Sequence, residues 1–415
     1  MTGAGPDELL DRLATLPAAG PLLDRLRDAE GVYLVGGAVR DLLRHARPLD
    51  LDLVVDGELE PVAARLGTPA RSHDRFETCT VVLDGFTYDL ARARRERYPQ
   101  PGALPVVTPA TIEQDLSRRD FTVNALALGL SGEERGRLVS APGGREDLRH
   151  SRLRVLHDAS FRDDPTRLLR LARYVNRLGF SIEAGTLALA AAAVADGAPG
   201  TVSGARIGSE LRLLAGEPDP VGAYGALAEL GVDEAVAPGF GIRDGARAAL
   251  ARRALGLLPA DGHRADLVLA VAAMDLPAHQ LPGLMDRWGF PAARRDRIAA
   301  AALRSPVVAQ SLAVVARPSE IARAAGPGPV ELVALAGALG PQDPARRWLQ
   351  DLRHVRLEIT GEDLLDAGVA RGPAIGAGLA AALAAKLDGH GAGRAGELAE
   401  ALRAATAIAQ GGPPG

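Results

Sequence analysis

Residues 32–43 read Val-Tyr-Leu-Val-Gly-Gly-Ala-Val-Arg-Asp-Leu-Leu, and residues 50–55 read Asp-Leu-Asp-Leu-Val-Val. The first stretch is a short apolar run followed by two glycines and a helix-like segment, which predicts a buried strand that turns into a helix. The second stretch begins with alternating polar and apolar residues, the pattern of a strand with one buried face. Together the two stretches predict an N-terminal part in which strands and helices mix.

The two aspartates of the second stretch are candidate metal ligands. Successive side chains of a strand point to opposite faces, so Asp50 and Asp52 are expected on one face while Leu51, Leu53 and Val55 enter the core. Two carboxylates this close repel each other unless a cation lies between them. Mg²⁺ prefers a few carboxylates plus substrate phosphates, so Asp50 and Asp52 are the predicted magnesium ligands. A solvated acidic strand edge is the alternative.

A third candidate carboxylate follows in a predicted hairpin. The runs Thr80–Leu83 and Phe86–Leu90 flank Asp84-Gly85, a signal for a two-residue type I′ turn. Counting from the turn places Asp89 on the face opposite the apolar side chains. Three acids on neighbouring strands could hold two ions, one at an attacking hydroxyl and one at a triphosphate.

The glycine pair is a candidate phosphate contact. Glycines let backbone N–H groups approach phosphate oxygens, and a helix N-terminus adds positive potential, so Gly36 and Gly37 are expected beside a triphosphate that Arg40 faces. An ordinary strand–turn–helix corner is the alternative. A glycine pair followed within ~15 residues by a strand that carries two aspartates is much more specific than either feature alone.

Composition bounds the function classes without selecting one. The chain has 415 residues, 47% of them apolar but only 3% aromatic, which indicates two to four helix-rich domains. The net charge of −4 argues mildly against nucleic-acid binding, yet Lys386 is the only lysine, so nearly all 48 basic residues are arginine. Arginine matches phosphates and base edges in geometry, although a biased genome gives the same excess.

Other features predict a cytoplasmic protein. Cys79 is the only cysteine, which excludes an internal disulfide and fits a reducing compartment. Acidic residues near the N-terminus argue against a signal peptide. The longest apolar run is about half the ~18–20 residues of a membrane span, so we expect no membrane association.

The predicted fold class is α+β, with a mixed-sheet head followed by all-helical parts. Strand signals end near residue 150, a loop rich in Arg, Glu and Pro is expected over residues 92–114, and helical patterns run from Pro165 to Ile408. Clusters of Gly and Pro divide the helical part. The predicted domains are a head (1–150), a neck (151–235), a body (236–345) and a tail (346–415).

These motifs, in this order, resemble the class II tRNA nucleotidyltransferase and bacterial poly(A) polymerase family. Residues 118–125, Arg-Arg-Asp-Phe-Thr-Val-Asn-Ala, are similar to the family's R-R-D-F-T-x-N-A segment, and residues 163–167 to its E-D-x-x-R helix. Residues 89–105 resemble the segment around its third carboxylate and flexible loop. The similarity is strong over about residues 30–235. One departure is Asp163, where the family usually has Glu, so no role is carried over to it.

The resemblance implies a nucleotidyltransferase-type head, Mg²⁺ as cofactor, CTP and ATP as donors and tRNA as partner; oligomeric state stays open. It implies Asp50, Asp52 and Asp89 as catalytic residues. The residues implied in nucleotide binding are Gly36, Gly37, Arg40, Asp41, Arg119, Asp120, Asn124, Asp164, Arg167, Arg170 and Arg173. A buried structural Arg–Asp pair is the alternative for Arg119 and Asp120.

Asp164 and Arg167 suit the selection of C and A. They are three apart, so they share a helix face, and Arg170 and Arg173 continue that arc. Cytosine and adenine offer an exocyclic amine, which Asp164 can accept, beside a ring nitrogen to which Arg167 can donate; guanine and uracil would be mispaired at both contacts. We expect exchange of the two residues, Asp164→Arg with Arg167→Asp, to shift selection toward U and G. A solvated arginine stripe is the alternative.

The sequence therefore predicts an enzyme that adds CCA to the 3′ end of tRNA. Related alternatives are an enzyme that adds only A and a poly(A) polymerase. By family resemblance, the intact segment over residues 92–114 argues against a CC-only form. An RNA-binding protein without catalysis is the distant alternative, against which the retained Asp50, Asp52 and Arg167 speak.

Overall fold

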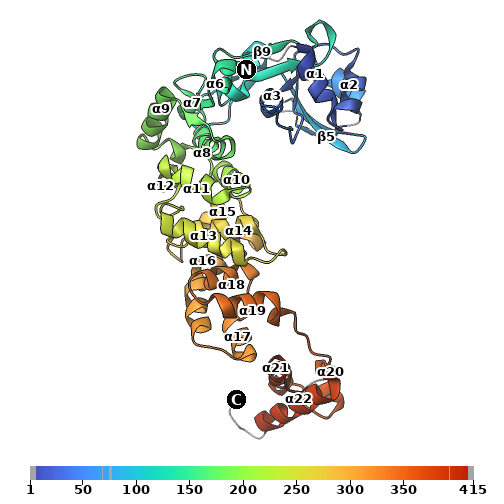
Figure 1. Ribbon diagram of the computed structural model, residues 1–415, viewed down its shortest axis with the longest axis vertical. Helices are drawn as coiled ribbons and strands as arrows, with labels where there is room; N and C mark the ends of the chain where they lie inside the picture. Colours follow the sequence, from blue (N-terminus) through green and yellow to red (C-terminus); the bar gives the residue numbers. More distant parts are fainter. Residues whose placement is uncertain (1–5, 68, 74–76, 392, 410–415) are drawn as a thin grey trace. The chain divides into compact units, whose positions relative to one another are not determined.

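The computed structural model describes residues 6–67, 69–73, 77–391 and 393–409. The chain folds into two compact units, one made of Met1–Glu210 with Glu229–Val236 and the other of Leu211–Ala228 with Ala237–Gly415. Figure 1 shows strands in the blue-to-green first unit and helices throughout the yellow-to-red second unit. The predicted α+β class is confirmed. The subdivision of the helical part into neck, body and tail stays a prediction.

A mixed seven-stranded sheet forms the centre of the first unit, with strand order β3-β4-β5-β2-β1-β8-β9. Its one parallel pair joins β2 to β5, and the other neighbours are antiparallel. The strands are β1 (Val32–Val35), β2 (Leu53–Val55), β3 (Pro69–His73), β4 (Thr78–Leu83), β5 (Phe86–Arg92), β8 (Leu126–Gly129) and β9 (Leu138–Ser140).

Both faces of this sheet are covered. In β1, Val32 and Leu34 enter one apolar core, whereas Tyr33 and Val35 enter a second core on the opposite face, as strand alternation requires. The larger core packs against α1 (Pro6–Ala14), α2 (Ala19–Leu26), α3 (Gly37–Leu43) and α4 (Leu59–Leu66), and the smaller against α5 (Ile112–Ser117).

The hairpin predicted at Asp84-Gly85 is confirmed. Both turn residues have positive φ, 50° and 83°, as a type I′ turn demands, and Leu83 pairs with Phe86 across it. Tyr88 is buried, and its hydroxyl donates to the carbonyl of Ala18 in the larger core. Asp89 is exposed on the opposite face, as the strand period predicts.

The loop expected over residues 92–114 is shorter in the structure, where residues 98–105 connect two strands. Strands β6 (Arg94–Arg97) and β7 (Val106–Pro109) pair antiparallel there, and α5 begins at Ile112. The charged residues of β6 indicated a solvated segment, but the Glu96 side chain is only 8% exposed because arginines neutralise it. Buried charge is tolerated where it is paired and hydrogen-bonded.

Apart from the strands and helices already described, the first unit is largely helical. Its elements are α6 (Gly144–Arg149), β10 (Arg152–Leu153), α7 (Ser160–Asp163), α8 (Thr166–Leu178), β11 (Ser181–Ile182), α9 (Ala184–Ala195), α10 (Gly204–Ala215, which runs on into the second unit) and α12 (Val232–Val236), with short 3₁₀ turns at Thr122–Asn124, Gly132–Glu134 and Ala198–Thr201.

The second unit contains helices and a 3₁₀ turn at Leu352–His354, and α14 and α18 are buried along most of their length. In none of the described ranges does a helix have the length and apolarity that crossing a membrane needs. The helices are α11 (Pro220–Glu229, which ends in the first unit), α13 (Gly245–Leu257), α14 (Arg264–Ala272), α15 (Leu281–Arg287), α16 (Ala292–Ala313), α17 (Pro318–Ala325), α18 (Val330–Ala338), α19 (Gln342–Gln350), α20 (Gly361–Asp366), α21 (Pro373–Leu387) and α22 (Gly393–Ala409).

Candidate active site in the first unit

A polar pocket of about 420 Å³ lies within the first unit. Six arginines and four carboxylates line it, so its walls carry net positive charge. Such a pocket favours an anionic ligand. The charged lining residues are Asp52, Arg94, Glu96, Arg118, Arg119, Asp120, Asp164, Arg167, Arg170 and Arg206.

The sheet brings Asp52 and Asp89 together. Leu53 in β2 pairs in register with Leu90 in β5, so the residues that precede them, Asp52 and Asp89, are neighbours at the same end of the parallel pair. Asp50 lies two residues earlier, exposed like Asp52, while the intervening leucine is buried. Both aspartates precede β2, which begins only at Leu53, so a shared strand face for them stays a prediction.

The neighbouring acids act on the charge of Asp52. Part of the Asp52 side chain reaches solvent. Burial of its carboxylate nevertheless raises the pKa of Asp52, the charges of Asp89 and Asp50 raise it further, and Arg119 lowers it. A carboxylate among like charges is the arrangement that a cation relieves. Asp89 is held in place by a 2.6 Å hydrogen bond from the Thr80 hydroxyl.

The donor set fits a cation that shares its ligands with a substrate. Within the described ranges, no three His, Cys, Asp or Glu side chains lie close enough together to hold a metal ion by themselves. Mg²⁺ characteristically takes one or two protein carboxylates and completes its octahedron with water and phosphate oxygens. Asp50 and Asp52 suit that role, and magnesium stays a prediction.

Gly36 joins β1 to α3 at the edge of the pocket. Its φ is 69°, in the region that favours glycine, and a Cβ there would lie 3.0 Å from Arg119 Nη1. Its N–H donates to the carbonyl of Leu126, so this amide is not available to a phosphate. The predicted phosphate contact therefore falls to Gly37, the first residue of α3.

We expect Gly36→Ala to lower the free energy of unfolding by about 1–3 kcal/mol, because alanine resists positive φ and its methyl displaces the Arg119 guanidinium. Urea denaturation measures the loss. Gly37→Ala is the matched control, since its φ is not positive and its Cβ would lie 3.5 Å from Arg40 Nη2, an ordinary contact. Equal losses in the two variants would contradict this account of the turn.

A buried chain of polar side chains supports one wall. Arg170 Nη2 lies 2.6 Å from Asp120 Oδ2, and Asn124 Nδ2 donates to Asp120 Oδ1 over 3.1 Å. Asn124 Oδ1 accepts from Arg40 Nη1 over 2.6 Å, and Arg40 Nε donates to Asp41 over 2.9 Å. Burial raises the pKa of Asp120, but the charge of Arg170 and the bond from Asn124 more than offset it, so the pKa is lowered.

Arg119 and Asp120 do not pair with each other, but each lies in an Arg–Asp pair of its own, so the alternative of a buried structural pair stays open. Arg119 Nη2 instead donates to Asp115 over 3.0 Å, and its buried Nε has no hydrogen-bond partner within the described ranges. An unsatisfied guanidinium nitrogen in a pocket is available to a ligand. The arginine stripe is buried only in part, because Arg167 is 3% exposed and Arg173 9%, whereas the Arg170 side chain is 33% exposed.

Asp164 and Arg167 line the pocket together, each fixed by separate partners. Asp164 Oδ1 accepts from the N–H and hydroxyl of Thr166 and from Arg206 Nη2, which lies 2.6 Å away. Arg167 donates from Nη1 to the Ser160 hydroxyl and from Nη2 to the carbonyl of Arg118, both over 2.6 Å. Among the residues that the structure describes, Oδ2 of Asp164 and the other guanidinium donors of Arg167 have no hydrogen-bond partner, so a ligand can use them.

Asp115 is a completely buried carboxylate that three arginines surround. Its Oδ1 accepts from Arg118 Nε and Nη2 over 2.8 and 2.6 Å and from the N–H of Arg94, and its Oδ2 accepts from Arg119. Burial raises the pKa of Asp115, but the charges and hydrogen bonds of Arg118 and Arg119 outweigh it and lower the pKa below its ordinary value of 3.8. Asp115 therefore stays ionised in the folded chain.

We expect the free energy of unfolding to fall as the pH drops below about 4, because Asp115 binds a proton more readily in the unfolded chain. The contribution is complete above the unfolded pKa and is lost as the pH falls through the lower folded value. Asp115→Asn should cost about 3 kcal/mol near neutral pH, because it removes the partner of two arginines, and should flatten the acid limb. Denaturant titrations from pH 3 to 7 measure both effects. The control is Asp24→Asn, with a side chain 77% exposed; an unchanged acid limb in Asp115→Asn would contradict the assignment.

Most predicted site residues line this pocket. It contains Gly36, Gly37, Asp52, Arg119, Asp120, Asn124, Asp164, Arg167 and Arg170. Five predicted residues do not line it: Asp50, Asp89, Arg40, Asp41 and Arg173. Their roles stay predictions.

Seven lining residues were not predicted from the sequence. Arg94 and Glu96 alternate along β6, and Tyr98 continues the same spacing just after the strand ends, a period-two signal that was available in the sequence. Arg206 gave no such signal, because its partner Asp164 lies 42 positions earlier. The others are Pro105, Arg118 and Tyr174.

Comparison with known proteins agrees with this geometry. Residues 32–154 match the model of the poly(A) polymerase head domain. A CC-adding tRNA nucleotidyltransferase of Deinococcus radiodurans is 37% identical over 360 residues, which cover 84% of this chain and 82% of that protein. An A-adding tRNA nucleotidyltransferase of Halalkalibacterium halodurans is 42% identical over 233 residues, 54% of each chain. An A-adding relative of Geobacter sulfurreducens is 33% identical over 90% of this chain but 45% of its own length. The matches thus span about half the length of the two A-adding relatives.

Solved structures are similar over almost the whole chain. The apo form II of a CCA-adding enzyme superposes with a TM-score of 0.81 at 30% identity and covers 97% of this chain and 100% of that one. The CCA-adding enzyme of Thermotoga maritima complexed with tRNA gives 0.76 at 26% identity, covering 97% and 99%. A CCA-adding enzyme in complex with CTP gives 0.78 at 28% identity, covering 97% of both. Because the Deinococcus relative matches most of both chains, and the head motifs lie together around one basic pocket, this chain belongs to the class II tRNA nucleotidyltransferase family.

Proposed function

We propose that this chain adds C and A nucleotides to the 3′ end of tRNA, with CTP and ATP as donors. The observation that carries the proposal is that one positively charged pocket contains both the acid Asp52 and the pair Asp164 and Arg167. A nucleoside triphosphate has an anionic end and a base edge, and this pocket offers a chemically suitable group to each.

The proposed reaction is an in-line transfer. The 3′ hydroxyl of tRNA attacks the α-phosphorus of the bound nucleotide, a new P–O bond forms, the bond to the β-phosphate oxygen breaks, and pyrophosphate leaves with the β- and γ-phosphates. Asp50 and Asp52, with Asp89 beside them, would hold Mg²⁺, which stabilises charge on the attacking and leaving oxygens. Arg119 and the other pocket arginines position the triphosphate, and positioning supplies a large part of such catalysis.

Nucleotide choice rests on Asp164 and Arg167. Oδ2 of Asp164 accepts from the exocyclic amine of cytosine or adenine, and Arg167 donates to the adjacent ring nitrogen. A pair of hydrogen bonds of this kind favours the correct base over a wrong one by about 1–3 kcal/mol. Uracil and guanine would leave buried donors and acceptors unpaired, which makes rejection stronger than attraction alone. Protein side chains thereby take the place of a template.

The alternatives are related enzymes that add different nucleotides to the 3′ end of RNA. Relatives are named both A-adding and CC-adding, so addition of part of the CCA sequence is the second candidate, with poly(A) synthesis as a third. A binding protein without catalysis is disfavoured because the acidic face beside the pocket is retained.

Extension assays on three tRNA substrates test the proposal. Purified protein is incubated with Mg²⁺ and labelled tRNA that ends at the discriminator base, at C or at CC, with CTP and ATP separately and together. Completion of all three ends to CCA supports the proposal. Extension of the CC end alone indicates an A-adding enzyme, a long ladder with ATP indicates poly(A) synthesis, and binding of tRNA without release of pyrophosphate would overturn an enzymatic role.

A further inference from the structure

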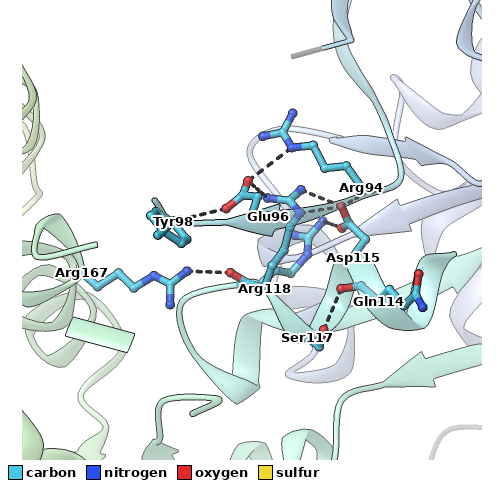
Figure 2. A network of polar contacts seen from close by, with 9 residues as sticks. Arg94, Glu96, Tyr98, Gln114, Asp115, Ser117, Arg118 and Arg167 are labelled. Atoms are coloured by element: carbon cyan, nitrogen blue, oxygen red, sulfur yellow. Dashed lines mark hydrogen bonds and ion pairs between the residues drawn. The ribbon is translucent and has the colours of Figure 1, made fainter. Parts of the chain in front are cut away.

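Glu96 is a buried acid at the centre of a polar network beside the pocket (Figure 2). Its Oε1 accepts from Arg118 Nη1 over 2.7 Å and from Arg94 Nε over 3.3 Å, and its Oε2 accepts from the Tyr98 hydroxyl over 2.9 Å. Neither the proposed transfer step nor base selection uses Glu96 directly. Burial of an acid with three donors restricts all of these side chains to one arrangement.

Arg118 transmits this arrangement to the base-selecting residue. Its guanidinium is held between two buried carboxylates, Glu96 and Asp115. Its main-chain carbonyl accepts from Arg167 Nη2 over 2.6 Å, as Figure 2 shows. Arg118 therefore connects the two sites: Glu96 and Asp115 hold its side chain, and its main-chain carbonyl holds the Arg167 guanidinium. The proposed function assigns that guanidinium to the nucleobase.

Tyr98 is a second partner of Glu96 in the wall of the same pocket. Its side chain and that of Arg167 both line the pocket, and they lie close enough to influence each other electrostatically. Burial and the charge of Glu96 raise the pKa of Tyr98, so its hydroxyl stays protonated and donates to Glu96. Glu96 thus holds two side chains, those of Arg118 and Tyr98, that line the pocket together with Arg167.

We propose that Glu96 is a positioning residue for nucleotide selection: by holding Arg118 and Tyr98, it fixes the direction in which Arg167 presents its donors to the base. The inference rests on the proposed function, because it concerns the same pocket. Its physical basis is that a donor discriminates between base edges only while its direction is fixed, since a mobile guanidinium can also turn toward a carbonyl oxygen.

A structural role predicts a different outcome from a positioning role. If Glu96 only attaches the β6–β7 hairpin to the rest of the first unit, its loss lowers thermal stability and the active fraction, and all four nucleotides lose rate in proportion. If Glu96 positions Arg167, its loss lowers the preference for CTP over UTP and for ATP over GTP. The ratio of kcat/KM values separates the two, because the active fraction cancels in it.

The test compares Glu96→Gln and Glu96→Ala with the wild-type full-length chain. Gln keeps an acceptor but loses the charge, so we expect the CTP-to-UTP preference to fall about threefold in Glu96→Gln and about tenfold in Glu96→Ala. Tyr98→Phe removes only the hydroxyl bond and should give a smaller fall in the same direction. Glu113→Gln is the matched control, because Glu113 lies in α5 with a side chain 56% exposed and is not in the pocket.

Equilibrium binding of CTP and UTP without tRNA is measured alongside transfer. If the wild-type chain transfers nucleotides and both preferences stay unchanged in Glu96→Gln, Glu96→Ala and Tyr98→Phe, this inference is wrong and the proposed function stands. If the wild-type chain binds CTP over UTP but transfers nothing, the proposed function fails, and the binding preference of the variants still decides the role of Glu96. Should Glu96→Ala not fold, Glu96→Gln and Tyr98→Phe give the decision.

Discussion

Asp52→Asn is expected to lower the rate of nucleotide addition about 10³-fold while raising the thermal stability of the chain. The loss follows from removing one of the carboxylates that would hold the cation at the reacting phosphate. The gain follows because burial and the charges of Asp89 and Asp50 raise the pKa of Asp52, which means that the folded state disfavours its charge. If Asp52 served folding instead, its replacement would lower the thermal stability and leave the rate of addition by the folded chain unchanged.

Pyrophosphate release and thermal unfolding measure these two effects. The control is Asp84→Asn, which removes one negative charge from an exposed turn position in the same sheet. Asparagine tolerates the positive φ of that turn. A variant Asp52→Asn that keeps wild-type activity, or that loses activity only because it unfolds, would contradict the assignment of Asp52 to catalysis.

The second large effect concerns the polarity of the base-reading pair. Exchange of the two residues, Asp164→Arg with Arg167→Asp, should move the CTP-to-UTP preference by about 10²-fold toward UTP. The exchange also affects a third residue, because Asp164 forms an ion pair with Arg206 at 2.6 Å. An arginine at position 164 faces Arg206, and the repulsion should lower the rate with every nucleotide.

A third substitution tests whether this repulsion lowers the rate. Adding Arg206→Glu restores an ion pair to the exchanged site, so the triple variant should keep the preference for U and G and transfer faster than the double variant. Single-turnover rates with each of the four nucleotides measure both quantities. An unchanged preference for CTP and ATP in the double and triple variants would refute base selection by this pair.

Much of the head could be predicted from the sequence because its signals are local. Alternation in residues 50–55, the Asp84-Gly85 turn and the apolar run before Gly36 each depend on neighbouring residues only. The adjacency of Asp89 to Asp52 depends on the parallel pairing of β2 with β5. Such a pairing joins distant segments, and nothing in a single sequence fixes its register.

The sequence misled where charge is buried. Arg94 and Glu96 read as solvated because charged residues rarely enter a protein interior unless they are paired. Arg118, the partner of Glu96, is 22 residues further along the chain, so this pairing could not be inferred. For the same reason Asp115, which is completely buried among arginines, gave no signal as the residue that supports Arg118 and Arg119.

The most direct test of the central claim is a crystal structure of the chain with Mg²⁺ and a non-hydrolysable CTP analogue. The account predicts the triphosphate beside Asp52 and Arg119, with the cytosine amine at hydrogen-bond distance from Asp164 Oδ2 and its ring nitrogen facing Arg167. A nucleotide bound outside this pocket, or one whose base turns away from Arg167, would contradict it.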